Sequence, residues 1–231
     1  KIAPCIACNQ ACLDHTFSGK ISSCLVNPKA CFETELVSTK ALNKKSVAVI
    51  GAGPAGMSAA VEAAQRGHAV TLFEKAQAIG GQLNLAKMVP GKEEFWGLVD
   101  WFEEMLKSSG VDVRLGKTVT STDVIEFDEV IVATGVIPRD PKIKGQEENN
   151  VLSYTEVLKG GRKIGQKVAV VGAGGIGFDV SEYLVHESRS DFKQIEIPDW
   201  MKEWGVGDPE LTAGGLAESG PRPEEASRQV I

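Results

Sequence analysis

The feature that most constrains the fold of this 231-residue chain is an apolar run followed by three regularly spaced glycines. Residues 47–50 (VAVI) have the continuous apolar character of a buried parallel strand, and an alanine-rich helix is expected over 57–66. Between them lie Gly51, Gly53 and Gly56. The first glycine allows a tight turn, the second lets the backbone approach a pyrophosphate, and the third lets helix and strand pack closely. The pattern predicts a dinucleotide-binding unit with the pyrophosphate at the helix N-terminus.

An acidic residue occupies the expected place after this turn. The predicted strand 69–73 ends at Glu74, 18 residues after Gly56. A carboxylate there can accept hydrogen bonds from the hydroxyls of an adenosine ribose. Because glycine spacing, context and acid agree, we favour dinucleotide binding over a tight turn without a ligand. Residues 80–82 (GGQ) predict a loop whose glycines permit close backbone approach or act as a simple hinge.

The same pattern begins again about 120 residues later. A strand is expected over 167–171, then come Gly172, Gly174 and Gly177, and a helix is expected over 178–185. Two dinucleotide turns in one chain suggest electron transfer between two nucleotide cofactors. The residue that distinguishes NAD from NADP would follow the next strand, so the residues present do not decide this preference.

The remaining elements complete an α/β pattern. An amphipathic helix is expected over 94–109, and strands over 111–115 and 129–133. Residues 187–227 lack clear periodicity and are interpreted as a long insertion before a strand that opens at 228–231. The predicted fold class is therefore α/β, with dinucleotide-binding, doubly wound (Rossmann-like) units preceded by a cysteine-rich segment.

All five cysteines lie within the first 31 residues. Cys5, Cys8, Cys12 and Cys24 supply four thiolates within 20 residues, which suits a tetrahedral zinc ion or a [4Fe–4S] cluster. Zinc sites usually use two closely spaced cysteine pairs, so three bunched cysteines and one remote cysteine favour the cluster. Disulfides or free thiols are a further alternative. Cys31 is interpreted as a packed free thiol.

Charge and hydropathy exclude several classes of partner. The net charge is −6 and the pI about 5.3, which gives no support for nucleic-acid binding through a basic patch. No apolar signal sequence precedes the first cysteine. The longest uncharged stretch, 46–61, is too short to cross a membrane and is interrupted by glycines. We therefore expect a cytoplasmic protein without a nucleic-acid or membrane partner.

Several segments are similar to one known family. The cysteine-bearing segments are 5–12 (CIACNQAC) and 23–28 (SCLVNP), and the second glycine turn is 171–177 (VGAGGIG). Three further segments lie around the first glycine turn, namely 49–56 (VIGAGPAG), 80–84 (GGQLN) and 90–95 (PGKEEF). In these segments the chain resembles the iron–sulfur, FAD-binding and NADPH-binding parts of bacterial 2,4-dienoyl-CoA reductase (NADPH). This is an iron–sulfur flavoprotein family related to NADH:flavin oxidoreductases and trimethylamine dehydrogenase.

The resemblance implies a mechanism for a longer parent chain. NADPH would give a hydride to FAD, FAD would pass single electrons to a [4Fe–4S] cluster, and the cluster would reduce FMN in a TIM barrel. FMN there would reduce 2,4-dienoyl-CoA in fatty acid β-oxidation. The barrel would precede Lys1 and further parts of the nucleotide domains would follow Ile231. We therefore expect a middle fragment that does not reduce dienoyl-CoA by itself.

The resemblance also implies domains and site residues. It implies an iron–sulfur cluster segment over 1–36, the N-terminal part of an FAD-binding domain over 37–150, and the start of an NAD(P)H-binding domain over 151–231. The implied cluster ligands are Cys5, Cys8, Cys12 and Cys24. The implied FAD contacts are Gly51, Gly53, Pro54, Ala55, Gly56, Glu74, Lys75, Gly81, Gln82, Leu83, Val119, Ala133, Thr134 and Gly135. The implied NADPH contacts are Gly172, Gly174, Gly175, Ile176 and Gly177.

Other readings remain open at this point. His15, His68 and His186 have no motif around them and are interpreted as structural, so no catalytic residue is named. An amine dehydrogenase or another ene-reductase would share the same segments. A non-enzymatic, zinc-stapled nucleotide-binding module is the alternative from a different class.

Overall fold

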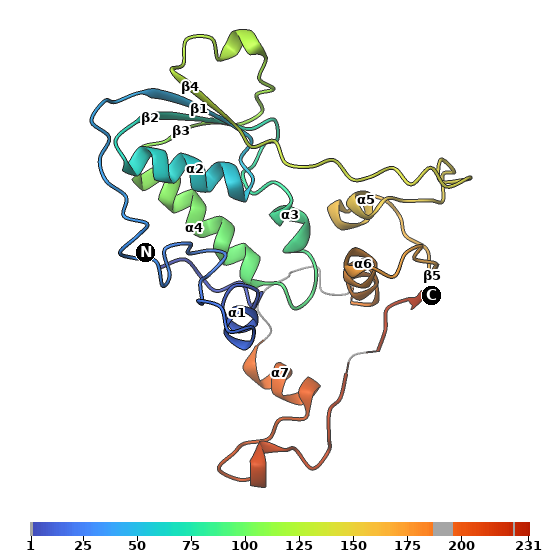
Figure 1. Ribbon diagram of the computed structural model, residues 1–231. Coiled ribbons are helices and arrows are strands. Elements are labelled where there is room, and N and C mark those ends of the chain that lie inside the picture. Colours follow the sequence, from blue (N-terminus) through green and yellow to red (C-terminus); the bar gives the residue numbers. More distant parts are fainter. Residues whose placement is uncertain (1, 187–195, 224) are drawn as a thin grey trace. The chain divides into compact units, whose positions relative to one another are not determined.

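The chain forms two compact units (Figure 1). The structure is a computed structural model that describes residues 2–186, 196–223 and 225–231. The first unit comprises Lys1–Lys87 and Glu94–Lys142, and the second comprises Met88–Glu93 and Ile143–Ile231. The short segment Met88–Glu93 thus belongs to the second unit, although the residues on both sides of it belong to the first.

A parallel sheet forms the centre of the first unit. Its strands have the order β3-β2-β1-β4, and they are β1 (Ser46–Ile50), β2 (Ala69–Phe73), β3 (Asp112–Arg114) and β4 (Glu129–Val132). Val49 of β1 lies opposite Leu72 of β2 and Ile131 of β4. This arrangement confirms the predicted α/β fold class, and it brings the carboxyl ends of the strands to one edge, where ligands bind in such sheets.

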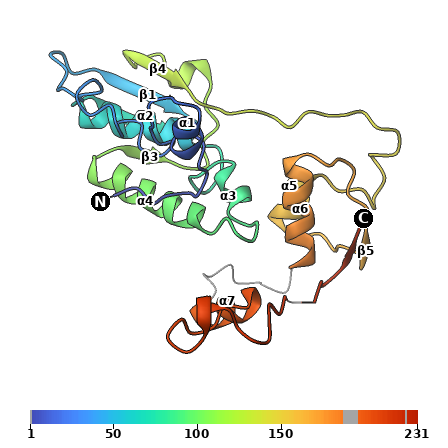
Figure 2. The same cartoon turned by 60° about the horizontal axis from the view of Figure 1, so that its bottom comes forward.

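Two helices cover one face of this sheet. They are α2 (Pro54–Gln65) and α4 (Glu94–Ser108), which lie along the same face in Figures 1 and 2. The core between helices and strands is made of buried apolar side chains, among them Val47, Val49, Met57, Leu72, Leu98, Phe102 and Leu106. Two short helices, α1 (Leu13–Phe17) and α3 (Leu83–Ala86), complete the first unit.

The second unit contains α5 (Tyr154–Lys159), β5 (Lys167–Val168), α6 (Gly175–Val185) and β6 (Gln229–Val230). β5 and β6 are parallel, which confirms that a strand opens within 228–231. β5 is shorter than the predicted strand 167–171. The amide of Val170 donates to the carbonyl of Ile231 at 2.8 Å, two residues beyond the end of β5.

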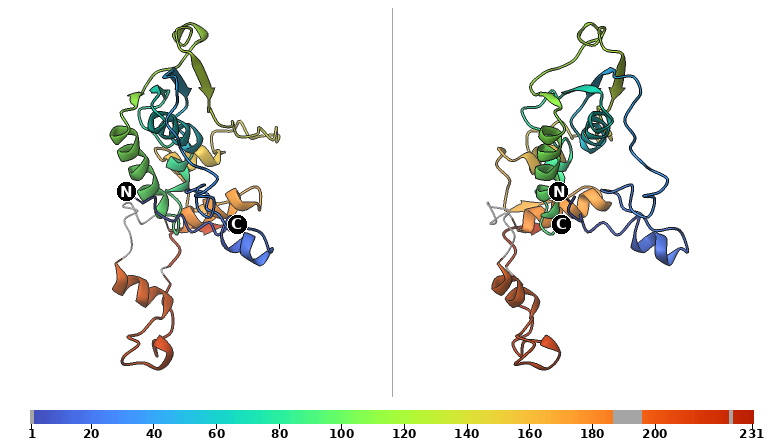
Figure 3. Two further views of the ribbon diagram at one scale, coloured as in Figure 1. Left: turned by 60° about the vertical axis from the view of Figure 1, so that its left-hand side comes forward. Right: turned by 90° about the vertical axis from the view of Figure 1, so that its left-hand side faces the viewer.

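The interpretation of 187–227 as a stretch without periodicity is wrong for its described part; residues 187–195 and 224 lie outside the described residues. Helix α7 (Ile197–Trp204) is followed by a 3₁₀ turn at Ala213–Gly215 (Figure 3). Ile197, Trp200 and Trp204 recur at helical spacing, and Gly205 ends the helix with a left-handed φ of 66°. The helical periodicity of these apolar residues was present in the sequence, but a helix of eight residues is too short to be recognised within a long irregular segment.

Two helices start earlier than predicted, because the glycine turns serve as their N-caps. α2 begins at Pro54 instead of residue 57, since Gly53 is the extended N-cap and proline is favoured in the first turn. α6 likewise begins at Gly175 instead of residue 178. Apart from the early end of β5, the other predicted boundaries of these helices and strands agree with the structure to within one residue. In the described part of the chain, no helix is long and apolar enough to cross a membrane.

Candidate functional site

The first glycine turn joins β1 to α2, and two of its three glycines are required by the turn itself. Gly51 has a φ of 104°, and a Cβ atom on it would lie 2.4 Å from the carbonyl oxygen of Ala133. A Cβ atom on Gly56 would lie 1.8 Å from the carbonyl oxygen of Gly51. A Cβ atom on Gly53 would meet nothing within 4 Å. The open space therefore lies at the middle glycine, beside the N-terminus of α2, where an anionic phosphate would be favoured.

Glu74 is connected to this turn by hydrogen bonds. The residue is only 8% exposed, and its Oε2 accepts a hydrogen bond from the amide of Ala52 at 2.8 Å. Oε1 accepts a hydrogen bond from the amide of Ala76, also at 2.8 Å. A carboxylate offers about four acceptor positions, so it can still accept hydrogen bonds from ribose hydroxyls. The neighbouring Lys75 is exposed.

Two further loops meet the first glycine turn. The amide of Gly80 donates to the carbonyl of Ala52 at 2.8 Å, and a Cβ atom on Gly81 would lie 3.0 Å from the Cα of Gly53. The side chain of Gln82 donates to the carbonyl of Val136 at 3.1 Å, directly after the predicted contacts Ala133, Thr134 and Gly135. The structure thus brings three of the predicted FAD-contacting loops together, although they are far apart in the sequence.

Val119, one of the predicted FAD contacts, lies in a loop anchored beside Glu74. The amide of Lys117 donates to the backbone carbonyl of Glu74 at 2.9 Å, and Val119 is half-buried two residues later. A 3₁₀ turn, Ser121–Asp123, follows and is capped by Thr120. Hydrogen bonds from the Lys117 ammonium, the Thr120 hydroxyl and the Thr120 amide hold the pKa of Asp123 well below its usual range.

This cap predicts a pH-dependent stability. We expect Asp123→Asn to lower the urea midpoint of unfolding at pH 7, and the gap to wild type to narrow as the pH falls. The pKa of Asp123 is depressed in the folded state, so its stabilisation is complete above the unfolded pKa of about 4 and is lost below it. Urea titrations at pH 7, 4 and 2.5 measure this. Ser121→Ala is the control in the same turn, and a gap for Asp123→Asn that is constant with pH would contradict the prediction.

The second glycine turn repeats the geometry of the first. Gly172 has a φ of 122°, and a Cβ atom on Gly177 would lie 1.9 Å from the carbonyl oxygen of Gly172. The N-cap Gly174 has φ −86° and ψ −179°, close to the −75° and 179° of Gly53. Cβ atoms on Gly174 and Gly175 would meet nothing within 4 Å, and Ile176 is exposed. The turn therefore leaves the same space beside the N-terminus of α6.

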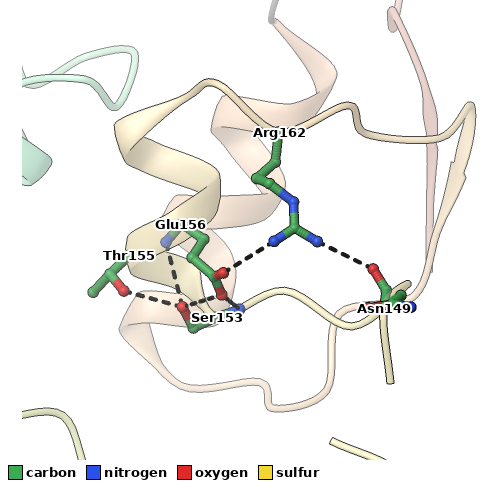
Figure 4. Close-up of polar contacts among 5 residues, drawn as sticks. All are labelled: Asn149, Ser153, Thr155, Glu156 and Arg162. Carbon is green, nitrogen blue, oxygen red and sulfur yellow. Dashed lines mark hydrogen bonds and ion pairs between the residues drawn. The ribbon is translucent and has the colours of Figure 1, made fainter. Parts of the chain in front are cut away.

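Two sets of polar contacts, which the sequence analysis did not predict, stabilise the segments next to α6. Lys92 reaches Asp179 on α6 with a 2.6 Å ion pair, so Met88–Glu93 is bonded to the helix that follows the turn. α5 packs against α6, and its N-cap is Ser153. The carboxylate of Glu156 accepts hydrogen bonds from Ser153 and from Arg162 (Figure 4). Arg162 also donates to the carbonyl of Asn149. The Ser-x-x-Glu spacing is the sequence pattern of a capping box, so this helix start could have been predicted from the sequence.

The cysteine segment packs against the first unit. Ile6 and Val26 pack against the core, and Lys29 forms an ion pair with Glu62 of α2. All five cysteines are free thiols, and Cys31 is exposed, so the prediction that it is packed is wrong. Among the described residues, no three side chains of His, Cys, Asp or Glu are placed to hold a metal ion together. The predicted ligands therefore fit a cluster in their chemistry and not in their placement.

Local backbone geometry around Cys8 is unusual for non-glycine residues. Ala7 and Asn9, on either side of it, have left-handed φ values of 52° and 56°, and the amide of Ala7 points at the sulfur of Cys5 at 3.3 Å. The three histidines each hydrogen-bond to the backbone through Nδ1: His15 with the carbonyl of Ile21, His68 with the amide of Lys45, and His186 with the carbonyl of Glu182.

Comparison with known proteins decides the family. Residues 45–201 match the model of the pyridine nucleotide-disulphide oxidoreductases. The chain belongs to this family. Pyridine nucleotide-disulphide oxidoreductase domains bind FAD and NAD(P)H, and the matched range contains both glycine turns.

Two curated relatives and one solved structure place this pyridine nucleotide-disulphide oxidoreductase more closely. It is 38% identical over 203 residues to a metal reductase of Desulforamulus reducens and 40% identical over 195 residues to an NADH oxidase of Thermoanaerobacter brockii. These matches cover 85% and 81% of this chain, which spans 30% of the length of each relative. The solved structure of a 2-naphthoyl-CoA reductase complex matches this chain with a TM-score of 0.76 and 27% identity. The match covers 98% of this chain and 39% of the chain in that structure. The chain is a flavoprotein oxidoreductase module related to these enzymes.

Proposed function

We propose that this chain is the electron-transfer segment of an NADPH-dependent flavoprotein reductase that operates in the cytoplasm. FAD binds at the first glycine turn and NADPH at the second. The observation that carries the proposal is the shared geometry of the two turns, each of which is closed by its third glycine and open at its middle glycine.

The chain's own residues would bind and orient the two nucleotides. The N-terminus of α2 and the space at Gly53, Pro54 and Ala55 receive the FAD pyrophosphate. Glu74 would accept hydrogen bonds from the hydroxyls of the adenosine ribose. The other proposed FAD contacts are Lys75, Gly81, Gln82, Leu83, Val119, Ala133, Thr134 and Gly135. Bound FAD supplies the conversion of a two-electron hydride donor into single-electron steps. Gly172, Gly174, Gly175, Ile176 and Gly177 receive the NADPH pyrophosphate in the same way.

The cysteine segment is proposed to hold a [4Fe–4S] cluster on Cys5, Cys8, Cys12 and Cys24. Four soft thiol donors in one segment support this, together with the Ala7 amide that points at the Cys5 sulfur. Because the thiols are not gathered in the structure, cluster binding requires this segment to rearrange. A zinc ion bound to the same thiols is the competing outcome.

The parent protein is proposed to carry an FMN-binding TIM barrel and to reduce 2,4-dienoyl-CoA. The 30% share of the curated relatives supports a longer parent, and the similarity to a CoA-ester reductase supports an acyl-CoA substrate. The chain by itself is not expected to reduce dienoyl-CoA. Turnover of an amine by the parent protein, with none of dienoyl-CoA, would assign the amine dehydrogenase alternative instead.

A flavin titration tests the nucleotide sites. The protein is incubated anaerobically with FAD, freed of excess cofactor, and mixed with one equivalent of NADPH. We expect a retained flavin spectrum whose visible bands bleach on adding NADPH, and slower bleaching with NADH. Protein that retains no flavin, or retained flavin that neither nicotinamide reduces, would contradict the proposal.

A further inference from the structure

The side chain of Asn84 crosses the loop that precedes it. Asn84 lies in α3 and is half-buried. Its Nδ2 atom donates a hydrogen bond to the carbonyl of Ile79 at 2.7 Å, five residues earlier. Ile79 itself packs against the hydrophobic core of the first unit. The hydrogen bond therefore connects the start of α3 to a core-anchored residue on the other side of the loop 80–83.

The amide group of Asn84 also lies over Gly80. A Cβ atom on Gly80 would lie 2.8 Å from Nδ2 and 2.9 Å from Oδ1 of Asn84. Gly80 has a φ of 111°, which L-residues rarely adopt. The asparagine amide thus occupies the space that any other residue at position 80 would need, and the two residues form a matched pair.

This matched pair fixes the loop against the first glycine turn. The amide of Gly80 donates to the carbonyl of Ala52, and Gly81 follows in close approach to Gly53. Gln82, next along the loop, donates to the carbonyl of Val136. Gly81 and Gln82 are exposed, so this part of the loop is open to a ligand.

We infer that Asn84 is a positioning residue for flavin binding. It holds the loop 80–83 in the conformation that meets the ligand and does not touch the ligand itself. The inference rests on the proposed binding of FAD at the first glycine turn. Without the hydrogen bond from Asn84, the loop would populate the binding-competent conformation only part of the time, and the apparent affinity for FAD would fall by that fraction. The loss of one neutral hydrogen bond corresponds to an affinity about three- to tenfold weaker.

Asn84→Asp tests the hydrogen bond without changing the shape of the side chain. At pH 7.5 the carboxylate has no hydrogen to donate to the Ile79 carbonyl, so we expect FAD to bind about three- to tenfold more weakly, measured by quenching of flavin fluorescence. At pH 5 part of the carboxyl is protonated and can donate, because partial burial beside a carbonyl raises the pKa of an unpaired carboxyl. The deficit should therefore shrink at pH 5, a pH profile that wild type lacks.

The matched control is Asn43→Asp, which introduces the same charge at an exposed position of the connector before β1. It should bind FAD like wild type at both pH values. Equal affinity of Asn84→Asp and wild type at pH 7.5, or a deficit that does not change with pH, would overturn the inference.

A measurement without ligand separates this inference from the proposed function. Hydrogen exchange at the Gly80 amide, which is bonded to Ala52, should accelerate in Asn84→Asp and not in Asn43→Asp. If wild type retains no FAD, the proposed function fails. Unchanged exchange at Gly80 in Asn84→Asp would overturn the positioning role, whether or not wild type binds FAD.

Discussion

Replacing Gly56 with alanine is expected to destabilise the first unit by about 3 kcal/mol or more, at the upper end of the range for overpacking. The new methyl group would lie 1.8 Å from the carbonyl oxygen of Gly51. Neither atom can move independently, because one belongs to the glycine turn and the other to the buried start of α2. Thermal unfolding of the FAD-free protein measures the loss, and FAD binding should disappear with the fold.

Gly53→Ala is the matched control for this change. Gly53 has an ordinary φ of −75°, and a Cβ atom there meets nothing within 4 Å. The fold should tolerate alanine, with an unchanged unfolding midpoint without FAD. If the FAD pyrophosphate occupies this space, the methyl group should weaken FAD binding at least tenfold, by about 1.4 kcal/mol or more. Wild-type affinity in Gly53→Ala would contradict this placement of the pyrophosphate, and a wild-type midpoint in Gly56→Ala would contradict the steric argument.

The second large effect is expected at the cysteines. Cys8→Ala should reduce bound iron from about four per chain to near zero after anaerobic reconstitution, because a cubane cluster that loses one of its four thiolate ligands is poorly held. Iron and acid-labile sulfide assays, with the brown colour of the protein, measure this.

Cys31→Ala provides the internal comparison. It removes a thiol from the same segment, and Cys31 is exposed and outside the proposed ligand set. Its iron content should equal that of wild type. Loss of iron in both variants would show that iron binding depends on the integrity of the whole segment and not on the four proposed ligands. Stoichiometric zinc in colourless wild-type protein would rule out the cluster and support the alternative of a zinc-stapled nucleotide-binding module.

The local parts of the fold could be predicted from the sequence, because they depend on neighbouring residues. Apolar runs gave β1 and β2, and Gly51 and Gly172 marked both strand–helix turns. Boundaries were less accurate where a turn residue also caps a helix, as Gly53 does for α2. α7 was missed because its apolar positions fill only eight residues of a segment rich in glycine and proline.

The assembly of the candidate site could be predicted only in part. Glu74 follows from its distance to the glycine turn, but its bonds to two backbone amides do not. The meeting of Gln82 with Val136 joins residues 54 positions apart, and no local pattern encodes that contact. The cysteine spacing indicates ligand chemistry, whereas no three of these thiols are placed to hold a metal ion together in the described part of the chain.

The path of the chain between its two units has a consequence for engineering. Residues 88–93 leave the first unit, bind α6 through Lys92 and Asp179, and return before α4. The two units are therefore not modules joined end to end, and no single cut in the sequence separates them. An exchange of the second unit between two related chains would have to graft two pieces, 88–93 and the stretch from 143 onward. A chimera joined only at the later boundary would carry the donor's α6 without the donor's segment 88–93, whose Lys92 forms the ion pair with Asp179 of α6.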